Sequence, residues 1–387
     1  MVYLIILLMI FTLIVIFSVY EDGKYSLPVF FALIIRLALI YFERNYPIFG
    51  HGDLVDYLPF FEYYKQSSWT YYISRTHVFF YTALYPGWLY EHLGDTHGIF
   101  AIKAMSAFFS ILVIFPLNSI IKSIYGVRID SFYTYIIFLW PTWLRYSIEV
   151  GRTSITAFFL LGTIAIILDL LNGFHLKNIL TLFVFIFFTL YLRIHYVAVL
   201  LPVFIIVLMR MMSNLPKIIS VIILVAFGSC LILVSYQFYF AKLGSYIELD
   251  SVEGLANFAS KREEGGSAYL GGLYPSSVFD LLWYLPIHAF YFMFSPMIFD
   301  VRSAFQLGSS LQALFTMFII FRIVKNKLLL SLSKTILAVI LCGAVGFGAV
   351  TKNAGGAERW RLPFTLIILS LGVTLKRRNL EYISVKN

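Results

Sequence analysis

The sequence predicts an all-α, polytopic integral membrane protein with roughly eleven transmembrane helices. Of its 387 residues, 60% are hydrophobic and only 13% are charged. The mean hydropathy of +0.87 lies far above that of soluble globular domains. Apolar runs recur along the whole chain, and no soluble domain of ordinary size fits between them. Residues 1–387 are therefore expected to form a single polytopic membrane domain.

Each apolar run is expected to be a helix, because a lone helix satisfies its own backbone groups in lipid. The first run lacks a basic leader region and a small-residue cleavage site, so we interpret it as a retained helix. The candidate spans are residues 1–20, 28–43, 98–121, 131–147, 153–171, 177–192, 194–210, 217–239, 305–323, 331–350 and 361–375.

Basic residues at the ends of these runs orient the chain, since cytoplasmic loops carry an excess of Lys and Arg. Alternation from the basic anchors places residues 44–97, 240–304 and 351–361 on the outer side. The net charge of +9 is then explained by sidedness and anionic lipids, with no nucleic-acid motif. The anchors are KRRN at 376–379, KNK at 325–327, Arg210 with Lys217, and Lys122 with Arg128.

Three outer stretches need a separate interpretation. HVFFYTALYPGWLYEHL at 77–93 is short and aromatic, so we expect it at the interface. LLWYLPIHAFYFMFSP at 281–296 is expected to be an interfacial or re-entrant helix, because it contains prolines and is flanked by Asp280 and Asp300. The long polar segment 241–280 has two interpretations, a flexible loop or a substrate lid.

The stretch HGDLVDYLPFFEYY at 51–64 concentrates carboxylates in a chain that has only 20 acidic residues. Asp53 and Tyr57 are four apart, and Pro59 suits the first turn of a following helix. A carboxylate at the water boundary is suited to act as a general base towards a hydroxyl. A solvated turn is the alternative interpretation.

A second polar stretch, WLRYSIEVGRTS at 143–154, joins two apolar runs. Arg145 and Glu149 are four apart and share one face of a helix. They either anchor a helix end at the interface or line a polar cavity in which Arg152 binds a phosphate.

Arg36 and Arg193 interrupt runs that are otherwise apolar. A charge at membrane depth is costly and usually faces a protein interior or a water-filled cavity. We therefore expect both arginines to serve packing or binding, with His195 and Tyr196 beside Arg193 near an outer helix end.

The stretch AGGAERWRLPF at 354–364 places Arg359 and Arg361 on the outer side, against the positive-inside bias. Phosphate binding near a helix N-terminus explains them, with Pro363 starting the final helix. Tolerated interfacial residues in a short loop are the alternative. The sequence carries no nucleotide or zinc motif and no metal-ligand spacing. No cofactor is therefore indicated, although a divalent metal is left open.

In this order, the motifs resemble the GT-C superfamily of membrane glycosyltransferases, which take sugars from polyprenyl-phosphate carriers on the outer side. GDLVDY resembles the Asp and Tyr of its first outer loop, and YTALYPGWLYEHLGDTHGIFAIKAMSAFFSIL resembles the stretch that follows. WPTWLRYSIEVGRTS and LYLRIHY are similar to later junctions. ERWRLP resembles the ending of membrane proteins from bacterial surface-polysaccharide clusters.

This resemblance implies that Asp53 is the general base for the acceptor hydroxyl. Arg359 and Arg361, with Arg193, would hold the lipid-linked phosphate as leaving group, and the aromatics of 57–64 would cover the sugar and the isoprenoid. The superfamily commonly has an acid directly after the residue matched by Arg152. This chain has Thr there, so Glu149 is the candidate second acid.

The resulting expectation is a glycosyltransferase of the bacterial inner membrane, acting in surface-polysaccharide assembly. Its partners would be a polyprenyl-linked donor, a glycan or lipid-linked acceptor, and membrane lipids. An O-antigen or capsule repeat-unit polymerase is the close alternative. A lipid-linked glycan flippase or transporter, with the buried arginines binding a lipid phosphate, is the alternative from another class.

Overall fold

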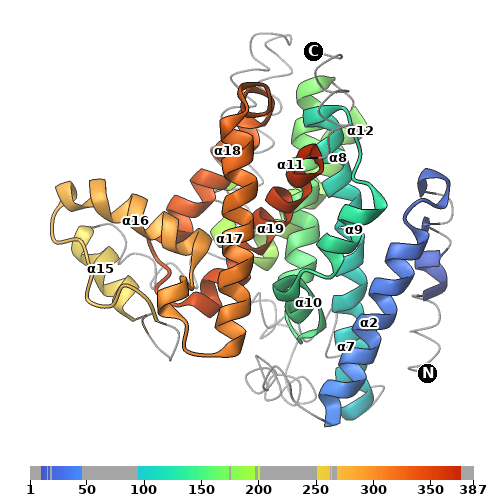
Figure 1. The fold of residues 1–387 in the computed structure, drawn as a ribbon, viewed down its shortest axis with the longest axis horizontal. Helices are drawn as coiled ribbons and strands as arrows, with labels where there is room; N and C mark the ends of the chain where they lie inside the picture. Colours follow the sequence, from blue (N-terminus) through green and yellow to red (C-terminus); the bar gives the residue numbers. More distant parts are fainter. Residues whose placement is uncertain are drawn as a thin grey trace. The chain divides into compact units, whose positions relative to one another are not determined.

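The computed structural model describes residues 10–14, 16–17, 20–45, 95–173, 176–196, 199–200, 251–261, 263 and 268–375. Within these ranges the chain is helical and forms no strand, apart from one isolated antiparallel bridge between Ala268 and Asn353. The predicted all-α class is therefore confirmed for the described part of the chain (Figure 1).

The described α-helices and 3-10 helices follow one another along the chain with short connections. The N-terminal set comprises η1 (Tyr20–Gly23), α2 (Ser26–Asn45), α7 (Asp95–Leu112), α8 (Ile114–Tyr125), α9 (Ser131–Phe138), α10 (Pro141–Ile148) and α11 (Thr153–Asn172). The later set comprises α12 (Leu176–Leu192), η3 (Ile194–Tyr196), α15 (Val252–Ser260), η6 (Val278–Asp280), α16 (Leu281–Phe294), η7 (Ile298–Asp300), α17 (Ala304–Lys325), α18 (Lys327–Gly348), α19 (Ala354–Leu371) and η8 (Gly372–Leu375).

Five described stretches are long and apolar enough to cross a membrane. They match predicted spans closely, as in α17, which covers 304–325 where 305–323 was predicted. The predicted count of eleven is not decided, because run 1–20 lies partly, and residues 201–239 lie wholly, outside the described ranges. The five stretches are Ser26–Glu43, Ile99–Tyr125, Thr153–Leu171, Gln306–Lys325 and Lys327–Gly348.

The predicted span 131–147 is wrong as a single helix. It is broken into α9 and α10 at Leu139–Trp140, directly before Pro141. Proline disfavours the helical conformation of the preceding residue, and Trp140 accordingly has φ −56° and ψ 119°. The break leaves two helices of 8 residues each, which is too short for either to cross a bilayer alone.

The final helix also begins earlier than predicted. Pro363 does not start it but lies inside α19, which begins at Ala354. The side chain of Asn353 caps this helix by accepting hydrogen bonds from the backbone N–H groups of Gly355 and Gly356, at 2.9 and 3.3 Å. Arg359 and Arg361 are therefore in the second and third turns of α19, not in a loop before it.

The described chain divides into two compact units. The first comprises residues 1–118 and 129–164, and the second comprises residues 119–128 and 165–387. In the first unit, α2 packs against α7, α9 and α10. In the second, α16 packs mainly against α18, and α17, α18 and α19 pack against one another.

Arg36 connects the helices of the first unit. Its side chain is fully buried, and its Nε donates to the hydroxyls of Ser110 on α7 and Ser147 on α10, both at 2.9 Å. The Nη2 group donates to the carbonyl of Phe138 at the end of α9, at 2.9 Å. Arg36 therefore serves helix packing, which is one of the two roles predicted for it.

Two glycines permit close helix packing in the second unit. A Cβ at Gly348 would lie 2.7 Å from backbone atoms of His288, so α16 and α18 approach closely there. A Cβ at Gly343 would clash with the ring of Phe364 on α19. These contacts fix the C-terminal part of α18, and with it the connection that leads into α19.

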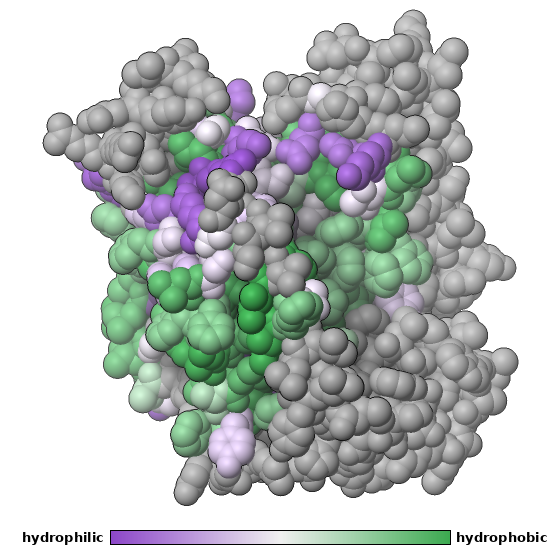
Figure 2. Space-filling view, turned by 90° about the vertical axis from the view of Figure 1, so that its right-hand side faces the viewer, coloured by the Kyte–Doolittle hydropathy of each residue, from purple (hydrophilic) through white to green (hydrophobic). Residues whose placement is uncertain are grey.

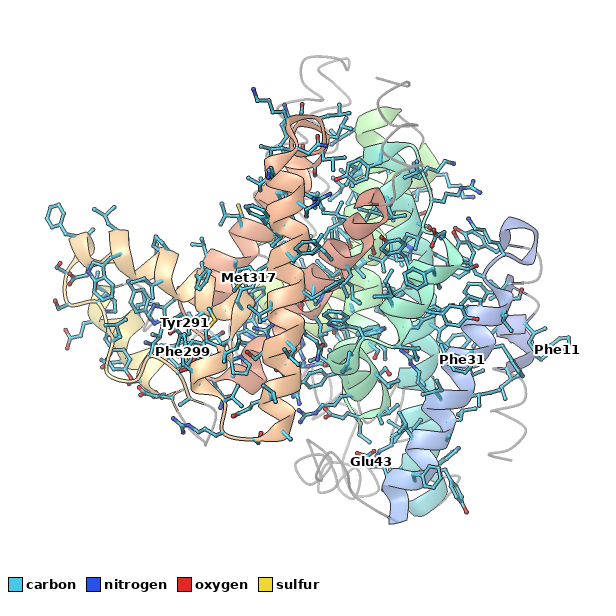
Figure 3. All side chains as sticks on the ribbon, viewed as in Figure 1. Phe11, Phe31, Glu43, Tyr291, Phe299 and Met317 are labelled. Carbon is cyan, nitrogen blue, oxygen red and sulfur yellow. The ribbon has the colours of Figure 1, made fainter. Side chains whose placement is uncertain are left out.

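Large hydrophobic side chains remain exposed on the long helices, as expected for surfaces that face lipid. Figure 2 shows one face on which hydrophobic residues predominate among those described, while hydrophilic residues gather towards one end. On α2, for example, Phe31 points outward, whereas Glu43 lies near the C-terminal end (Figure 3). The apolar helices indicate a protein embedded in a membrane.

Candidate functional site

The connection between α18 and α19, in the second unit, gathers the largest group of buried polar side chains that bear chemistry. Lys352 is fully buried, and Arg361 and Glu358 are each 6% exposed. The connection lies on the predicted outer side. Helices α16 and α18 surround it together with residues 268–274, a segment that we call the strap.

Arg361 is held between α19 and α16. Its Nη1 donates to the carbonyl of Phe292, near the end of α16, at 2.9 Å. Its Nη2 lies 3.9 Å from the carboxylate of Glu358, one helical turn earlier. A planar guanidinium with several donors is well suited to bind a phosphate bidentately. In this structure, Arg361 is covered.

The turn after α12 meets the same part of α19. His195 stacks on Trp360, with ring centroids 5.4 Å apart and an angle of 29° between the rings. The Tyr196 hydroxyl donates to the Trp360 carbonyl at 3.2 Å, and Arg193 is 8% exposed at the start of this turn. The structure therefore brings two predicted site segments together, 193–196 and 359–361, although 163 or more residues separate them.

Arg359 and Arg361 do not form one clamp. Residues two apart on a helix do not face each other. Arg361 is buried against α16, whereas Arg359 is partly exposed. The prediction that both arginines flank one phosphate near a helix N-terminus is therefore wrong in its geometry, because the helix starts at Ala354.

Lys352 has a complete set of hydrogen-bond acceptors. Its Nζ donates to the carbonyls of Leu273 and Leu270, at 2.7 and 3.3 Å, and to His288 Nε2, at 2.7 Å. His288 Nδ1 lies 3.0 Å from the carbonyl of Tyr284. This contact requires a proton on Nδ1, which leaves Nε2 as the acceptor for Lys352.

Aromatic and acidic groups complete the surroundings of this ammonium. Its Nζ lies 4.6 and 5.4 Å from the ring centroids of Tyr274 and Tyr284. The Tyr274 hydroxyl donates to Glu263. Burial lowers the pKa of Lys352 to about 8, and the negative charge of Glu263 opposes this shift.

The other predicted site residues lie elsewhere. In the first unit, Glu149 is 8% exposed and accepts a hydrogen bond from Arg145 Nε at 3.1 Å, which is the predicted i,i+4 pair. Arg152 lies at the start of α11, where the hydroxyl of Thr156 donates to its carbonyl at 2.7 Å. Asp53 and Tyr57 lie outside the described residues.

Among the residues that the structure describes, no group of three or more His, Cys, Asp or Glu side chains is arranged to hold a metal ion. The chemistry available in the described α18–α19 site is therefore that of cations, imidazoles and hydroxyl groups.

Lys352 and His288 were not predicted as site residues. A weak signal for Lys352 exists in the sequence, because it is a basic residue that follows an apolar run on the outer side. His288 gives no comparable signal, since a single histidine in an apolar helix does not show what its ring contacts. Their 64-residue separation makes the pair visible only in the fold.

No family model, no curated protein and no solved structure matches this chain.

Proposed function

We propose that this chain is a membrane glycosyltransferase that uses a polyprenyl-phosphate-linked sugar donor on the outer side of the membrane. In the proposed reaction, Asp53 accepts the proton of an acceptor hydroxyl, and the hydroxyl oxygen attacks the anomeric carbon of the sugar. The bond from that carbon to the phosphate oxygen breaks, and polyprenyl phosphate leaves with the bonding electrons.

One observation carries this proposal. Arg361 is held on an outer-side helix next to the stacked pair of His195 and Trp360. A guanidinium matches the developing charge on a phosphate leaving group, and flat rings match a sugar or an isoprenoid chain. Arg193, at the start of the same turn as His195, adds a second cation to this part of the unit.

The direct test is sugar transfer by the purified full chain in lipid nanodiscs, with a panel of short-chain polyprenyl-phosphate-linked hexoses. Release of free polyprenyl phosphate reports turnover. Asp53→Asn is expected to lower the rate by about 10²–10⁴-fold, the usual contribution of a general base. Glu62→Gln, a neighbouring acid in the same stretch, is the matched control. Full activity of Asp53→Asn would remove the assigned base.

A second measurement addresses Arg361. Arg361→Gln is expected to reduce transfer by about 10²-fold or more, as does loss of one transition-state donor elsewhere. Arg322→Gln, at an exposed arginine of α17, is the control.

Two further readouts separate the alternatives. A deletion strain with single-repeat surface glycan would favour a repeat-unit polymerase, whereas loss of every repeat would favour a transferase. Transbilayer movement of a labelled lipid without any glycan product would favour a flippase.

A further inference from the structure

The strap, residues 268–274, is fastened to the α18–α19 connection at several points. Ala268 and Asn353 form an antiparallel bridge, and the Tyr269 N–H donates to the Lys352 carbonyl at 3.0 Å. The Tyr269 hydroxyl donates to the Thr351 carbonyl at 2.8 Å. These bonds fasten the N-terminal end of the strap, whereas its remaining turn depends on the side chain of Lys352.

Lys352 is the only described side chain shown to bind the carbonyls of both Leu270 and Leu273. Its third bond, to His288, fastens the turn to α16. The three acceptors therefore come from two turn residues and one helix. Removing the ammonium would leave these acceptors without their donor, and unsatisfied buried acceptors favour any state in which water reaches them.

The turn that Lys352 holds has an unfavourable backbone conformation. Leu270 has φ of +52°, in the left-handed region that residues with a side chain rarely adopt. Gly272 also has a positive φ, of 72°, which glycine adopts readily. The strain at Leu270 persists only while surrounding contacts impose it, so release of the turn is favoured once those contacts are lost.

The strap lies next to Arg361. Tyr269 stacks on Tyr291 of α16, with ring centroids 5.6 Å apart, and Arg361 donates to the carbonyl of the next residue, Phe292. Figure 3 labels Tyr291 on this helix. The charge of Arg361 also acts on Tyr269, since it opposes the rise in the Tyr269 pKa that burial causes.

We propose that the strap is a closed lid over Arg361, that Lys352 is the positioning residue that latches it, and that the lid must open before a phosphate-bearing ligand reaches the guanidinium. The latch itself depends only on the contacts described above. The identity of the ligand, a polyprenyl-phosphate donor, rests on the proposed function.

Opening of the strap is measured with a thiol reporter. Thr351 is 4% exposed and lies against Tyr269, so we place Thr351→Cys in a background in which Cys230 and Cys342 are alanine. Maleimide labelling in nanodiscs is expected to be slow in the parent and at least about tenfold faster with Lys352→Met. Lys334→Met, at an exposed lysine of α18, is the matched control.

Equal labelling rates in the parent and in Lys352→Met would overturn the latch. A faster rate in both lysine variants would also overturn it, because the effect would then not be specific to Lys352.

The need for opening is measured with a reversible lock. Opposite residues of an antiparallel pair have Cα atoms about 4.5–5.5 Å apart, a separation that a disulfide spans. Ala268→Cys with Asn353→Cys should therefore close the strap when oxidised. Transfer from a polyprenyl-phosphate-linked hexose is expected to fall at least about tenfold on oxidation and to recover with reductant, since a closed lid blocks access. The reduced double variant controls for loss of the Asn353 cap.

The two experiments separate the proposals. Undiminished transfer by the oxidised protein would overturn the lid. If the parent transfers no sugar, the proposed function fails, while thiol labelling still decides the latch. In that case, the oxidised and reduced proteins are compared for binding of undecaprenyl phosphate, and equal affinity would overturn the lid.

Discussion

The two units each bury a cation, but the cations do different work. Arg36, inside α2, donates to hydroxyls and carbonyls that come from regular helices or their ends. Lys352, in a connection, donates to two carbonyls of a strained turn and to one imidazole. A cation whose acceptors lie on helices stabilises packing. One whose acceptors lie on a turn controls a segment that is able to move.

The largest expected effect is on the first cation. Arg36→Ala removes a fully buried side chain that connects α2 with α7, α9 and α10. We expect it to lower the free energy of unfolding by about 3–5 kcal/mol, through the cavity and the acceptors left without a donor. Denaturant titration in detergent measures this. Arg322→Ala, at an exposed arginine, should change stability by less than about 0.5 kcal/mol. Equal effects would contradict the packing role.

Two glycine substitutions test the packing that supports Lys352. Gly348→Ala places a Cβ 2.7 Å from the backbone of His288, and is expected to destabilise the second unit by about 1–3 kcal/mol. Gly308→Ala on α17 meets nothing within 4 Å and should stabilise the helix by about 0.5–1 kcal/mol. The two variants have the same chemical change, so opposite signs in thermal unfolding would identify close packing as the cause. The same sign in both would exclude it.

The pH dependence of strap opening tests the second cation. His288 and Tyr284 face Lys352 from α16, and Tyr274 and Glu263 face it from the strap side. The pKa of Lys352 is about 8 in the closed strap and about 10.4 once the side chain is in water. Between these values the open state binds more protons, so rising pH favours closure.

The measurement is the labelling rate of Thr351→Cys divided by that of an exposed thiol, Glu253→Cys. This ratio is expected to fall by up to about tenfold per pH unit between pH 8 and 10, and to stay flat in Lys352→Met. A ratio that rises with pH would show that the sign is wrong.

The smallest effect concerns the cap at the start of η6 and α16. The exposed Asp280 carboxylate accepts hydrogen bonds from the backbone N–H and the hydroxyl of both Ser276 and Ser277. These bonds hold the pKa of Asp280 well below its usual range. The cap should therefore survive at pH 4 and weaken only at lower pH. Amide exchange at Ser277 is expected to be faster in Asp280→Asn; unchanged exchange would show that the cap is unimportant.

The helices were the predictable part of the fold. Span 305–323 was read from one uninterrupted apolar run, and α17 agrees with it within two residues at either end. The errors arose where local backbone chemistry interrupts or extends a run. Pro141 breaks the predicted span 131–147, and Asn353 starts α19 well before Pro363.

The site was less predictable, since it depends on contacts between distant segments. The outward arginines were detectable because they contradict the usual charge bias. Which of them is buried was not, since burial depends on the Phe292 carbonyl of α16. Lys352 and His288 meet across 64 residues, and nothing local in either segment specifies that contact.

The most direct test of the account compares amide exchange in the two regions, with and without undecaprenyl phosphate in nanodiscs. The account predicts faster exchange across residues 269–274 as the lipid phosphate reaches Arg361 and the strap opens. Exchange around Ser110 and Ser147, the partners of Arg36, should stay unchanged. Unaltered exchange in the strap at saturating lipid, or an equal change in both regions, would contradict it.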